Sequence, residues 1–345
     1  MDASDLTKRF RMLLEGNPLS PLPQPRYPEA AVEIAPDRVT AVRVAQERKT
    51  GRWVLQGAAS GPLPPGAIQP SLTRPNILAP GPVARALESV LSEVGAGEGR
   101  ISLLLPDHVA RVALLGFAAL PRSRRELSDL VRFRMARSLP FKPDQAVMDI
   151  MVLGRGGGAS PQSSAFSVLA AFVHRAILEQ YEGLMASAGL WPGLVGLSTL
   201  ELYNLFRPRF DALLGKEKDA LLINVTRHDM TFLIFRDEDL IFYRCKLHLP
   251  GAEGDAALTA LRREIYTSFA FYQEKLLGRG IGRVFLRTSG VAADVVREVV
   301  SEEAGCPIEA LELTARLSLA EEVSPDPETL AAAAPAAGAA SGRSA

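Results

Sequence analysis

Apolar and polar residues alternate in the same order in two stretches of this chain. The first stretch predicts three short strands, a helix and a fourth strand, at residues 31–35, 38–45, 53–58, 81–94 and 101–105. The second stretch predicts the same succession, at residues 220–225, 230–235, 240–246, 258–277 and 284–286. In both helices apolar residues recur three or four positions apart, which indicates one buried face. We therefore expect two α/β units of similar design.

A different order of elements separates the two units. It predicts strand, helix, strand, strand and helix, at residues 111–117, 123–138, 146–153, 165–172 and 175–188. We interpret this segment as an inserted α+β subdomain. The expected divisions are an N-terminal appendage with a proline-rich connector (1–28), the first unit (29–106), the insertion (107–190), the return to the first unit (191–210), the second unit (219–322) and a tail (323–345).

Length and composition narrow the class of protein. The chain has 345 residues, enough for two or three domains, and its 39 Lys and Arg residues balance 39 Asp and Glu residues. This balance gives no net field that favours nucleic acid or an anionic membrane. Two cysteines, Cys245 and Cys306, argue against a disulfide framework and fit a reducing compartment. Because no segment approaches the roughly 20 apolar residues that cross a bilayer, we expect a cytoplasmic protein.

Several short phrases resemble PilM, the cytoplasmic actin-like family of type IV pilus assembly, itself similar to the cell-division protein FtsA. They are ELSDLV, SLPF, VMDI, VLAA and REIYTSF, at residues 126–131, 138–141, 147–150, 168–171 and 263–269. The resemblance covers about residues 30–340. It implies duplicated actin-like (ribonuclease H-like) halves with an inserted small α+β subdomain. In such proteins a nucleotide lies between the halves, and the insertion helps to form a groove for a partner.

The resemblance also identifies the positions that would hold a nucleotide. In actin-like ATPases two hairpins carry an Asp-x-Gly motif, whose carboxylate organises hydrated magnesium and whose glycine lets backbone N–H groups approach the phosphates. Here the first hairpin reads Glu-Ile-Ala-Pro-Asp, the second reads Asn-Val-Thr, and the adenosine loop reads Thr-Ser-Gly. The corresponding candidate residues are Glu33, Ala35, Asp37, Asn224, Thr226, Ser289 and Gly290.

These departures from the motif all weaken nucleotide binding. Ala35 adds a methyl group, Pro36 removes a backbone donor, and Asn224 lacks the charge of aspartate. A lost charge-assisted contact costs about 1.5–3 kcal/mol, whereas millimolar affinity corresponds to only about −4 kcal/mol. We therefore expect a pseudo-ATPase with no cofactor and no catalytic residue. The alternative is a functional actin-like protein that binds ATP with magnesium through the substituted residues.

The resemblance implies a partner as well. PilM-like proteins bind the short cytoplasmic tail of a PilN-like inner-membrane protein. We therefore expect an adaptor at the inner face of the inner membrane, associated with the membrane through that partner and without a nucleic-acid ligand. The expected groove lies between the first half and the insertion, where strand addition or apolar pockets would supply affinity. Its expected walls include Leu103, Leu105, Val131 and Met135.

Other candidate chemistry is sparse. A sugar or acetate kinase of the same superfamily would need a substrate-recognition cluster, and the sequence contains none. The four histidines show no metal-ligand spacing, so no metal site is expected. Asp107 and His108 follow a strand end and suggest a catalytic dyad, but no serine elbow accompanies them, and a solvated turn is the favoured interpretation. Cys245 lies in an apolar strand and is expected to be a small core residue.

The composition of the tail and the family resemblance predict different structures. Residues 325–345 are rich in alanine, proline, glycine and serine, which by itself indicates disorder. PilM-like chains instead end in a closing helix beside the nucleotide cleft, and residues 330–340 match that pattern in outline. Proline suits the first turn of a helix, and alanine suits its interior. We therefore expect a packed helix over residues 335–341 that is ordered by docking, since so short a helix is marginal alone.

Overall fold

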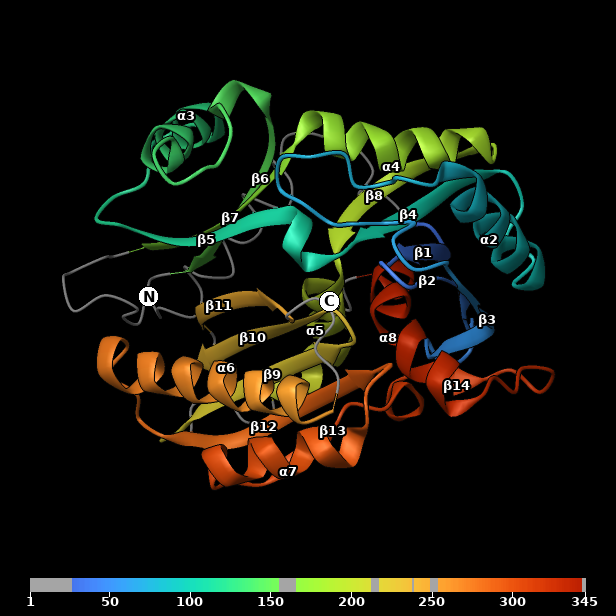
Figure 1. The fold of residues 1–345 in the computed structure, drawn as a ribbon. Helices are drawn as coiled ribbons and strands as arrows, with labels where there is room; N and C mark the ends of the chain where they lie inside the picture. Colours follow the sequence, from blue (N-terminus) through green and yellow to red (C-terminus); the bar gives the residue numbers. More distant parts are fainter. Residues whose placement is uncertain (1–26, 155–165, 212–216, 238, 249–253, 343–345) are drawn as a thin grey trace.

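The computed structural model describes residues 27–154, 166–211, 217–237, 239–248 and 254–342. They form three sheets with covering helices, arranged as two α/β halves and a smaller module (Figure 1). The predicted α/β fold of duplicated halves with an inserted subdomain is confirmed. The expected N-terminal appendage, residues 1–28, lies almost wholly outside the described residues.

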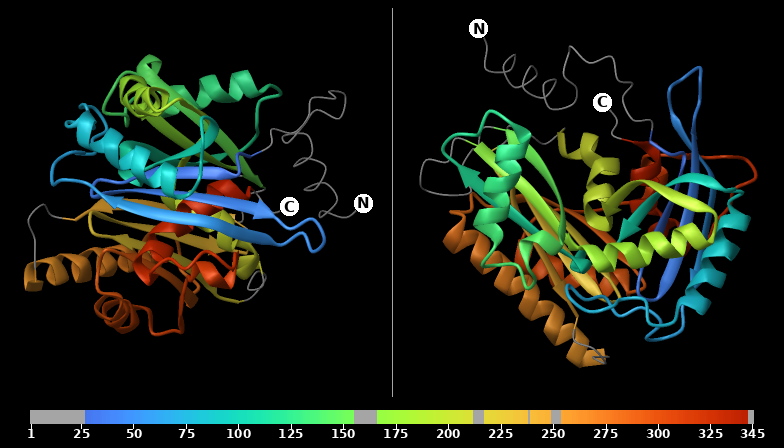
Figure 2. Two further views of the ribbon diagram at one scale, coloured as in Figure 1. Left: turned by 90° about the vertical axis from the view of Figure 1, so that its right-hand side faces the viewer. Right: turned by 90° about the horizontal axis from the view of Figure 1, so that it is seen from above.

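A six-stranded sheet forms the first half (Figure 2). Its strands lie in the order β14-β3-β2-β1-β4-β8, with bounds Ser318–Leu319, Trp53–Pro62, Arg38–Gln46, Ala30–Ile34, Gly99–Leu105 and Leu190–Leu197. Helices α2 (Pro80–Glu93) and α4 (Arg175–Ser187) contribute to the core on one face of this sheet, where Leu87 and Tyr181 are buried with Val32. Helix α4 closes the expected insertion in sequence, yet its apolar side chains belong to this core.

A five-stranded sheet forms the second half. Its strands lie in the order β11-β10-β9-β12-β13, with bounds Asp239–Leu247, Asp229–Arg236, Asp219–Thr226, Ile281–Ser289 and Ile308–Ala310. Helices α6 (Gly254–Lys275) and α7 (Ala293–Ala304) cover its outer face (Figure 1). Along β9, Ile223 belongs to this outer core, whereas Leu222 belongs to the core between the halves. The period of two therefore places Asn224 on the inner face.

The inserted module has a core of its own. Its antiparallel strands lie in the order β5-β7-β6, with bounds Ala110–Phe117, Phe166–His174 and Ala146–Gly154. Helix α3 (Arg124–Met135) buries Leu127 and Val131 against them. Ser123 caps this helix, because its side chain accepts a hydrogen bond from the N–H of Glu126 at 3.1 Å. Single 3₁₀ turns precede β5, β6 and β14, at Asp107–Val109, Pro143–Gln145 and Leu313–Ala315.

Two helices fill the space between the two large sheets. Helix α5 (Ser198–Asp211) follows β8, and α8 (Pro327–Ser341) packs against α5 and against strands β1 to β4 (Figure 1). The predicted packed helix over residues 335–341 is confirmed, and residues 332–341 are all buried. The helix begins at Pro327, however, after a cap by Asp326, so Pro335 lies inside the helix and its expected place in the first turn is wrong.

Among the residues that the structure describes, no helix is both long enough and apolar enough to cross a membrane.

Candidate functional site

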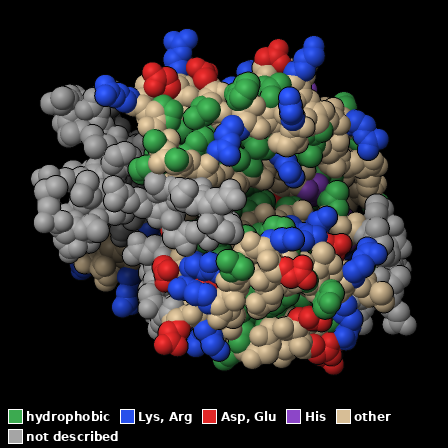
Figure 3. Space-filling model, turned by 90° about the vertical axis from the view of Figure 1, so that its left-hand side faces the viewer, with side chains coloured by type: hydrophobic (Ala, Val, Ile, Leu, Met, Phe, Trp, Pro, Cys, Tyr) green, Lys and Arg blue, Asp and Glu red, His purple; other side chains and the backbone are tan. Residues whose placement is uncertain are grey.

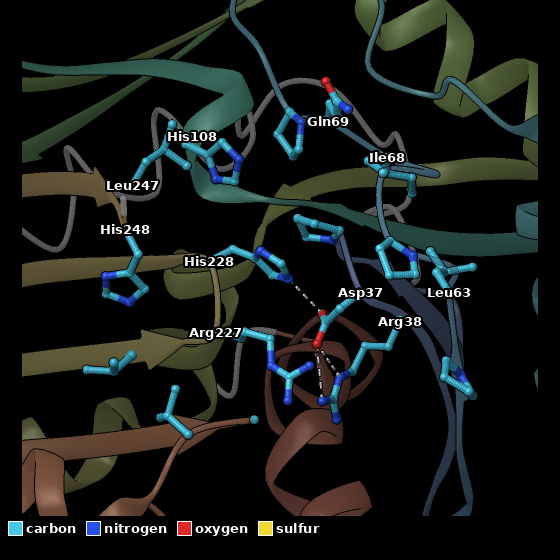
Figure 4. A pocket seen from close by; sticks show the side chains of 18 of the residues that line it. Asp37, Arg38, Leu63, Ile68, Gln69, His108, Arg227, His228, Leu247 and His248 are labelled. Atoms are coloured by element: carbon cyan, nitrogen blue, oxygen red, sulfur yellow. Dashed lines mark hydrogen bonds and ion pairs between the residues drawn. The ribbon is translucent and has the colours of Figure 1, made fainter. Parts of the chain in front are cut away.

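Two tight turns face each other across the cleft between the halves (Figure 4). Residues 35–37 join β1 to β2, and residues 227–228 join β9 to β10. The Asp37 carboxylate lies 3.6 Å from His228 Nε2 and accepts a hydrogen bond from Arg38 Nη2 at 3.2 Å. Burial opposes ionisation of Asp37, but the contact with His228 and the charge of Arg38 lower its pKa to about 2. The turns are thus linked by an ionised carboxylate.

A second His–Asp contact joins the halves deeper in the cleft. His108 Nδ1 lies 2.8 Å from Asp229 Oδ2, and the two side chains are 7% and 8% exposed. Thr226 Oγ1 donates to the other oxygen of Asp229 at 2.7 Å. Burial opposes ionisation of Asp229, but the hydrogen bond and charge of His108 lower its pKa. The favoured interpretation of Asp107 and His108 as a solvated turn is wrong, because the second half covers both residues.

The carboxylate of the first hairpin is held by the protein itself. Glu33 is 8% exposed and accepts a hydrogen bond from Ser198 Oγ at 2.5 Å. Burial raises the pKa of Glu33, and the charge of Arg287 and the bond from Ser198 oppose that rise. Ser198 lies at the first position of α5, so the strand-to-helix junction points its hydroxyl at the hairpin.

Arg287, on β12, is buried between the two motifs. It is 4% exposed, and its Nη1 donates to Asn224 Oδ1 at 2.9 Å. Its Nε and Nη2 donate to the carbonyl oxygen of Ala331 in α8 at 3.0 and 2.8 Å. Burial lowers the pKa of the guanidinium, and the charge of Glu33 raises it. The cation therefore compensates the buried carboxylate of Glu33 and ties the closing helix to the second hairpin.

Asp107 is the centre of a buried hydroxyl network. It accepts hydrogen bonds from the N–H of Thr199 at 3.1 Å, from the Thr199 hydroxyl, and from Thr231 Oγ1 at 2.9 Å. Asn224 Nδ2 donates in turn to Thr199 Oγ1 at 2.7 Å. Burial and the charge of Asp229 raise the pKa of Asp107 to about 6. The amide of Asn224 is therefore engaged at both ends by protein atoms.

Two hollows adjoin the hairpins, and they differ greatly in size. The inner cavity, among Glu33, Asn224 and Arg287, has a volume of about 30 Å³, which suits about one or two water molecules. The outer cleft has a volume of about 1740 Å³ and is lined by both turns, by part of the loop from Pro62 to Leu78 and by α6. Figure 3 shows a hollow between the two halves, with histidine and basic side chains at its edge. Room for a large ligand exists outside the hairpins but not between their motifs.

The structure brings the predicted nucleotide positions together. The small cavity is lined by six of them, Glu33, Ala35, Asp37, Asn224, Thr226 and Ser289. The seventh, Gly290, lines the outer cleft with φ of +68°, and a Cβ there would lie 3.1 Å from Arg38 Nη2. Glycine at this position therefore satisfies both the backbone conformation and the close approach to the first hairpin.

The residues expected to line a partner groove are core residues instead. The four side chains are at most 4% exposed and belong to two separate cores, with Leu103 and Leu105 in one and Val131 and Met135 in the other. Strand β4 pairs with β1 on one side and with β8 on the other, so it cannot accept an added strand. These four residues therefore do not form a common surface.

The edge of the first sheet offers an exposed alternative. Strand β8 pairs only with β4 among the described strands. Its side chains Trp191 and Val195 are 61% and 40% exposed. This edge combines free backbone groups with apolar side chains.

One cluster has the composition of a metal site. Ligand atoms of His108, Asp229 and Cys245 lie within 4.8 Å of one another. The spacing of these residues in the sequence does not reveal the cluster, because β10, β11 and the turn after β4 bring it together. Cys245 is half-buried, and burial raises the pKa of its thiol, so the thiol is protonated in this environment. His108 and Asp229 already bond to each other.

The sequence patterns did not identify the residues that form hydrogen bonds to the buried polar groups of the site. Arg287 has a recognisable signal, since it is a charge inside the apolar strand VFLRTS. Thr199 and Thr231 carry no such signal, because threonine is common in strands and at helix starts. Their contacts with Asp107 depend on how the halves meet.

Together these features define the class of fold, which is that of actin-like ATPases: two similar α/β halves with opposed hairpins across a cleft. No protein-family model and no curated protein matches the chain. Among solved structures, the PilM–PilN type IV pilus biogenesis complex matches with a TM-score of 0.73 and 16% identity, over 92% of this chain and 97% of the matched chain. The fold is therefore that of PilM, and the resemblance found in the sequence is confirmed at the level of fold.

Two further structures are similar to a lesser degree. A Bacteroides thetaiotaomicron protein with an actin-like ATPase fold has a TM-score of 0.49 and 7% identity, covering 85% of this chain and 93% of its own. The cytoplasmic domain of EpsL, from the type II secretion system of Vibrio cholerae, has a TM-score of 0.45 and 10% identity, covering 88% and 93%. Likeness at this level adds no argument about function.

Proposed function

We propose that this protein is a PilM-like adaptor of a type IV pilus or related secretion machine. In this proposal it lies in the cytoplasm at the inner face of the inner membrane and binds the cytoplasmic tail of a PilN-like protein. The observation that carries the proposal is the likeness to a chain of the PilM–PilN complex over 92% of this chain, at a TM-score of 0.73. Such coverage includes the inserted module as well as the two halves.

The edge of β8 is the surface that best fits an extended tail. Free backbone groups on an edge strand supply main-chain hydrogen bonds, and alternate side chains supply apolar contacts. Trp191 and Val195 lie on this edge, whereas β4 is enclosed by its neighbours. Pro192 lacks an N–H group, so a tail paired with β8 would gain fewer hydrogen bonds than on an uninterrupted edge.

A labelled peptide of the PilN-like tail tests this proposal by fluorescence anisotropy. Replacing Trp191 by Ala is expected to weaken binding about tenfold or more, because an exposed tryptophan at an interface commonly acts as an energetic hot spot. Leu319→Ala, on β14 at the opposite edge of the same sheet, is the matched control, since Leu319 is 36% exposed. Absence of tail binding by the wild type would refute the adaptor function. Equal binding by wild type and Trp191→Ala would refute only the assignment to β8.

We further propose that the protein is a pseudo-ATPase. The support is that the polar groups of the site are already hydrogen-bonded to one another: Ser198 binds Glu33, and both Arg287 and Thr199 bind Asn224. The cavity beside these residues has a volume of only about 30 Å³. A phosphate with hydrated magnesium would have to displace these contacts. Each displaced bond to a charged group costs about 1.5–3 kcal/mol.

Titration calorimetry with Mg-ATP tests the pseudo-ATPase proposal. The wild type is expected to show no binding in the micromolar range. The double variant Asn224→Asp with Thr226→Gly restores the second motif and is expected to gain at most weak binding, because Pro36 still removes a donor from the first hairpin. Micromolar affinity of the wild type would overturn the proposal.

The outer cleft supports a second candidate function. Its volume of about 1740 Å³ leaves room for a nucleotide held outside the motifs. Arg74 and Arg227 line this cleft beside Arg38, which is paired with Asp37 and Glu328. In that case the protein would be an ATP-binding actin-like assembly protein. Arg227→Ala would then weaken ATP binding in the calorimeter, whereas under the pseudo-ATPase proposal neither protein gives a binding signal.

A further inference from the structure

Helix α3 of the inserted module presents an exposed aromatic side chain. Phe133 is 80% exposed, and no other large hydrophobic side chain that the structure describes is as exposed. It lies two positions before the buried Met135 and two after the buried Val131, which places it about 200° round the helix from each of them. The side chain therefore points away from the module, where it gains no burial from this chain.

The segment that contains this aromatic residue is rich in basic residues. Residues 121–145 contain seven Arg and Lys residues but only three Asp and Glu residues, although the whole chain is balanced at 39 of each. The excess is thus local to α3 and its flanks, and Figure 3 shows basic side chains over this upper part of the molecule. Asp129 and Glu126 precede Phe133 by four and seven positions, so they lie on its face of the helix and offset part of the positive charge there.

Three of these basic residues have structural roles. Arg132 donates to the carbonyl oxygen of Pro143 at 2.7 Å, and Arg134 donates to that of Gly116 at 2.5 Å. Arg124 pairs with Asp149, another exposed residue, at 3.0 Å. The side chains of the remaining four are exposed and make no hydrogen bond or ion pair with the part of the chain that the structure describes; they are Arg122, Arg125, Arg137 and Lys142.

We propose that this face of α3 binds the surface of an anionic lipid bilayer, with Phe133 inserted among the headgroups. An aromatic ring that protrudes beside unpaired arginines suits a membrane interface, where the ring reaches the boundary between headgroups and acyl chains and the cations meet phosphates. The charges are spread from Arg122 to Lys142 and do not converge on one point, which fits a diffuse negative surface better than a single carboxylate of a protein partner. The contact is separate from the β8 edge and does not depend on the proposed tail binding.

Co-sedimentation of the whole protein with vesicles tests the proposal. Vesicles of phosphatidylcholine with phosphatidylglycerol are compared with vesicles of phosphatidylcholine alone. The wild type is expected to bind only the anionic vesicles and to dissociate as salt is raised, because screening weakens contacts between exposed charges. Failure to bind anionic vesicles at low salt would overturn the proposal. The alternative hypothesis would then be that the same face of α3 binds an acidic protein.

Two variants and a matched control locate the contact. Phe133→Ser is expected to weaken vesicle binding about fivefold through loss of the inserted ring. The double variant Arg122→Glu with Arg125→Glu is expected to weaken it more than about fivefold, because each cation near an anionic surface contributes about fivefold and this variant loses two of them. Both changes are at exposed positions, and glutamate at the start of a helix is favourable, so folding is preserved. Tyr266→Ser, on α6, removes a ring that is 62% exposed and should leave binding unchanged. Equal binding by all of these proteins would show that α3 is not the contact.

Discussion

The packing of α8 against α5 gives a prediction with an unusually clear steric basis. A Cβ built on Gly338 would lie 2.0 Å from the carbonyl oxygen of Glu201 and 2.8 Å from its carbonyl carbon. Ordinary contacts of a Cβ lie at 3.4–4 Å. The obstructing atoms belong to the backbone of α5, so no rotamer change can relieve the clash. Gly338→Ala therefore forces the two helices apart.

The expected magnitude follows from two opposing effects. Alanine stabilises a helix by about 1 kcal/mol relative to glycine. Overpacking of a tight core costs about 1–3 kcal/mol and occasionally more, and a clash with backbone belongs at the upper end. Residues 332–341 are all buried, so a shift of α8 disturbs the whole central core. We expect Gly338→Ala to lower the free energy of unfolding by about 2 kcal/mol net and the melting midpoint by about 3 °C, because a chain of 345 residues has a large entropy of unfolding.

Gly183→Ala provides the matched control. Gly183 lies inside α4, and a Cβ there would meet no atom within 4 Å. The same substitution should therefore raise the free energy of unfolding by up to about 1 kcal/mol, since only the helix propensity changes. Thermal unfolding followed by circular dichroism measures both variants. A midpoint for Gly338→Ala at or above that of the wild type would refute the close approach of α5 and α8.

Three further predictions concern carboxylates that are buried or half-buried. Burial raises the pKa of Asp107 to about 6, above its unfolded value of 3.8, so the wild type loses stability as pH rises from about 4 through 6. The free energy of unfolding of Asp107→Asn, relative to that of the wild type, should therefore rise by about 3 kcal/mol between about pH 4 and pH 7, as measured by denaturant unfolding. An equal difference between the two proteins at both pH values would contradict this prediction. Asp37, whose pKa is lowered to about 2, has the opposite pH dependence. Its ionised carboxylate contributes up to about 2 kcal/mol to the free energy of unfolding above about pH 4, and this contribution is lost toward about pH 2. The loss of stability caused by Asp37→Asn should therefore become smaller on acidification. Asp219 is buried and accepts bonds from Arg236 and Tyr272 at 2.8 and 2.7 Å, so Asp219→Ala should cost about 3–5 kcal/mol of unfolding free energy, and a loss below 1 kcal/mol would show that water replaces the carboxylate.

Most of the regular elements could be predicted from local patterns. The strand 220–225 appears as β9, and the helix 258–277 appears as α6 except for its last two residues, because period-two alternation and apolar residues three or four positions apart are properties of the chain itself. The bounds were less accurate, since α6 begins at Gly254. Helix α7 was missed, although Val296, Val299 and Val300 are spaced on one face. Its β-branched residues favour strands as well as a buried helix face, so the pattern is ambiguous.

The candidate site was predictable only in outline. The positions Glu33 and Asn224 could be located because each ends or nearly ends a strand before a turn, and the structure places both at one small cavity. What surrounds them could not be read in advance. Ser198, whose hydroxyl binds Glu33, lies 165 residues after it in the sequence. Arg287, whose guanidinium binds Asn224, lies 63 residues after it. Only the packing of the sheets brings these partners together.

By itself the sequence determined the two similar units, the insertion between them and the loss of the Asp-x-Gly motifs, because alternation, helical spacing and side-chain identity are local properties. The tertiary structure alone decided which polar residues are buried. Asp107 and His108 follow a strand end and look like a solvated turn, yet closure of the second half covers them and supplies Thr231 and Asp229 as partners. The alanine-rich tail is ordered for the same physical reason, since its small side chains allow α8 to approach α5 closely only when both sheets are already in place.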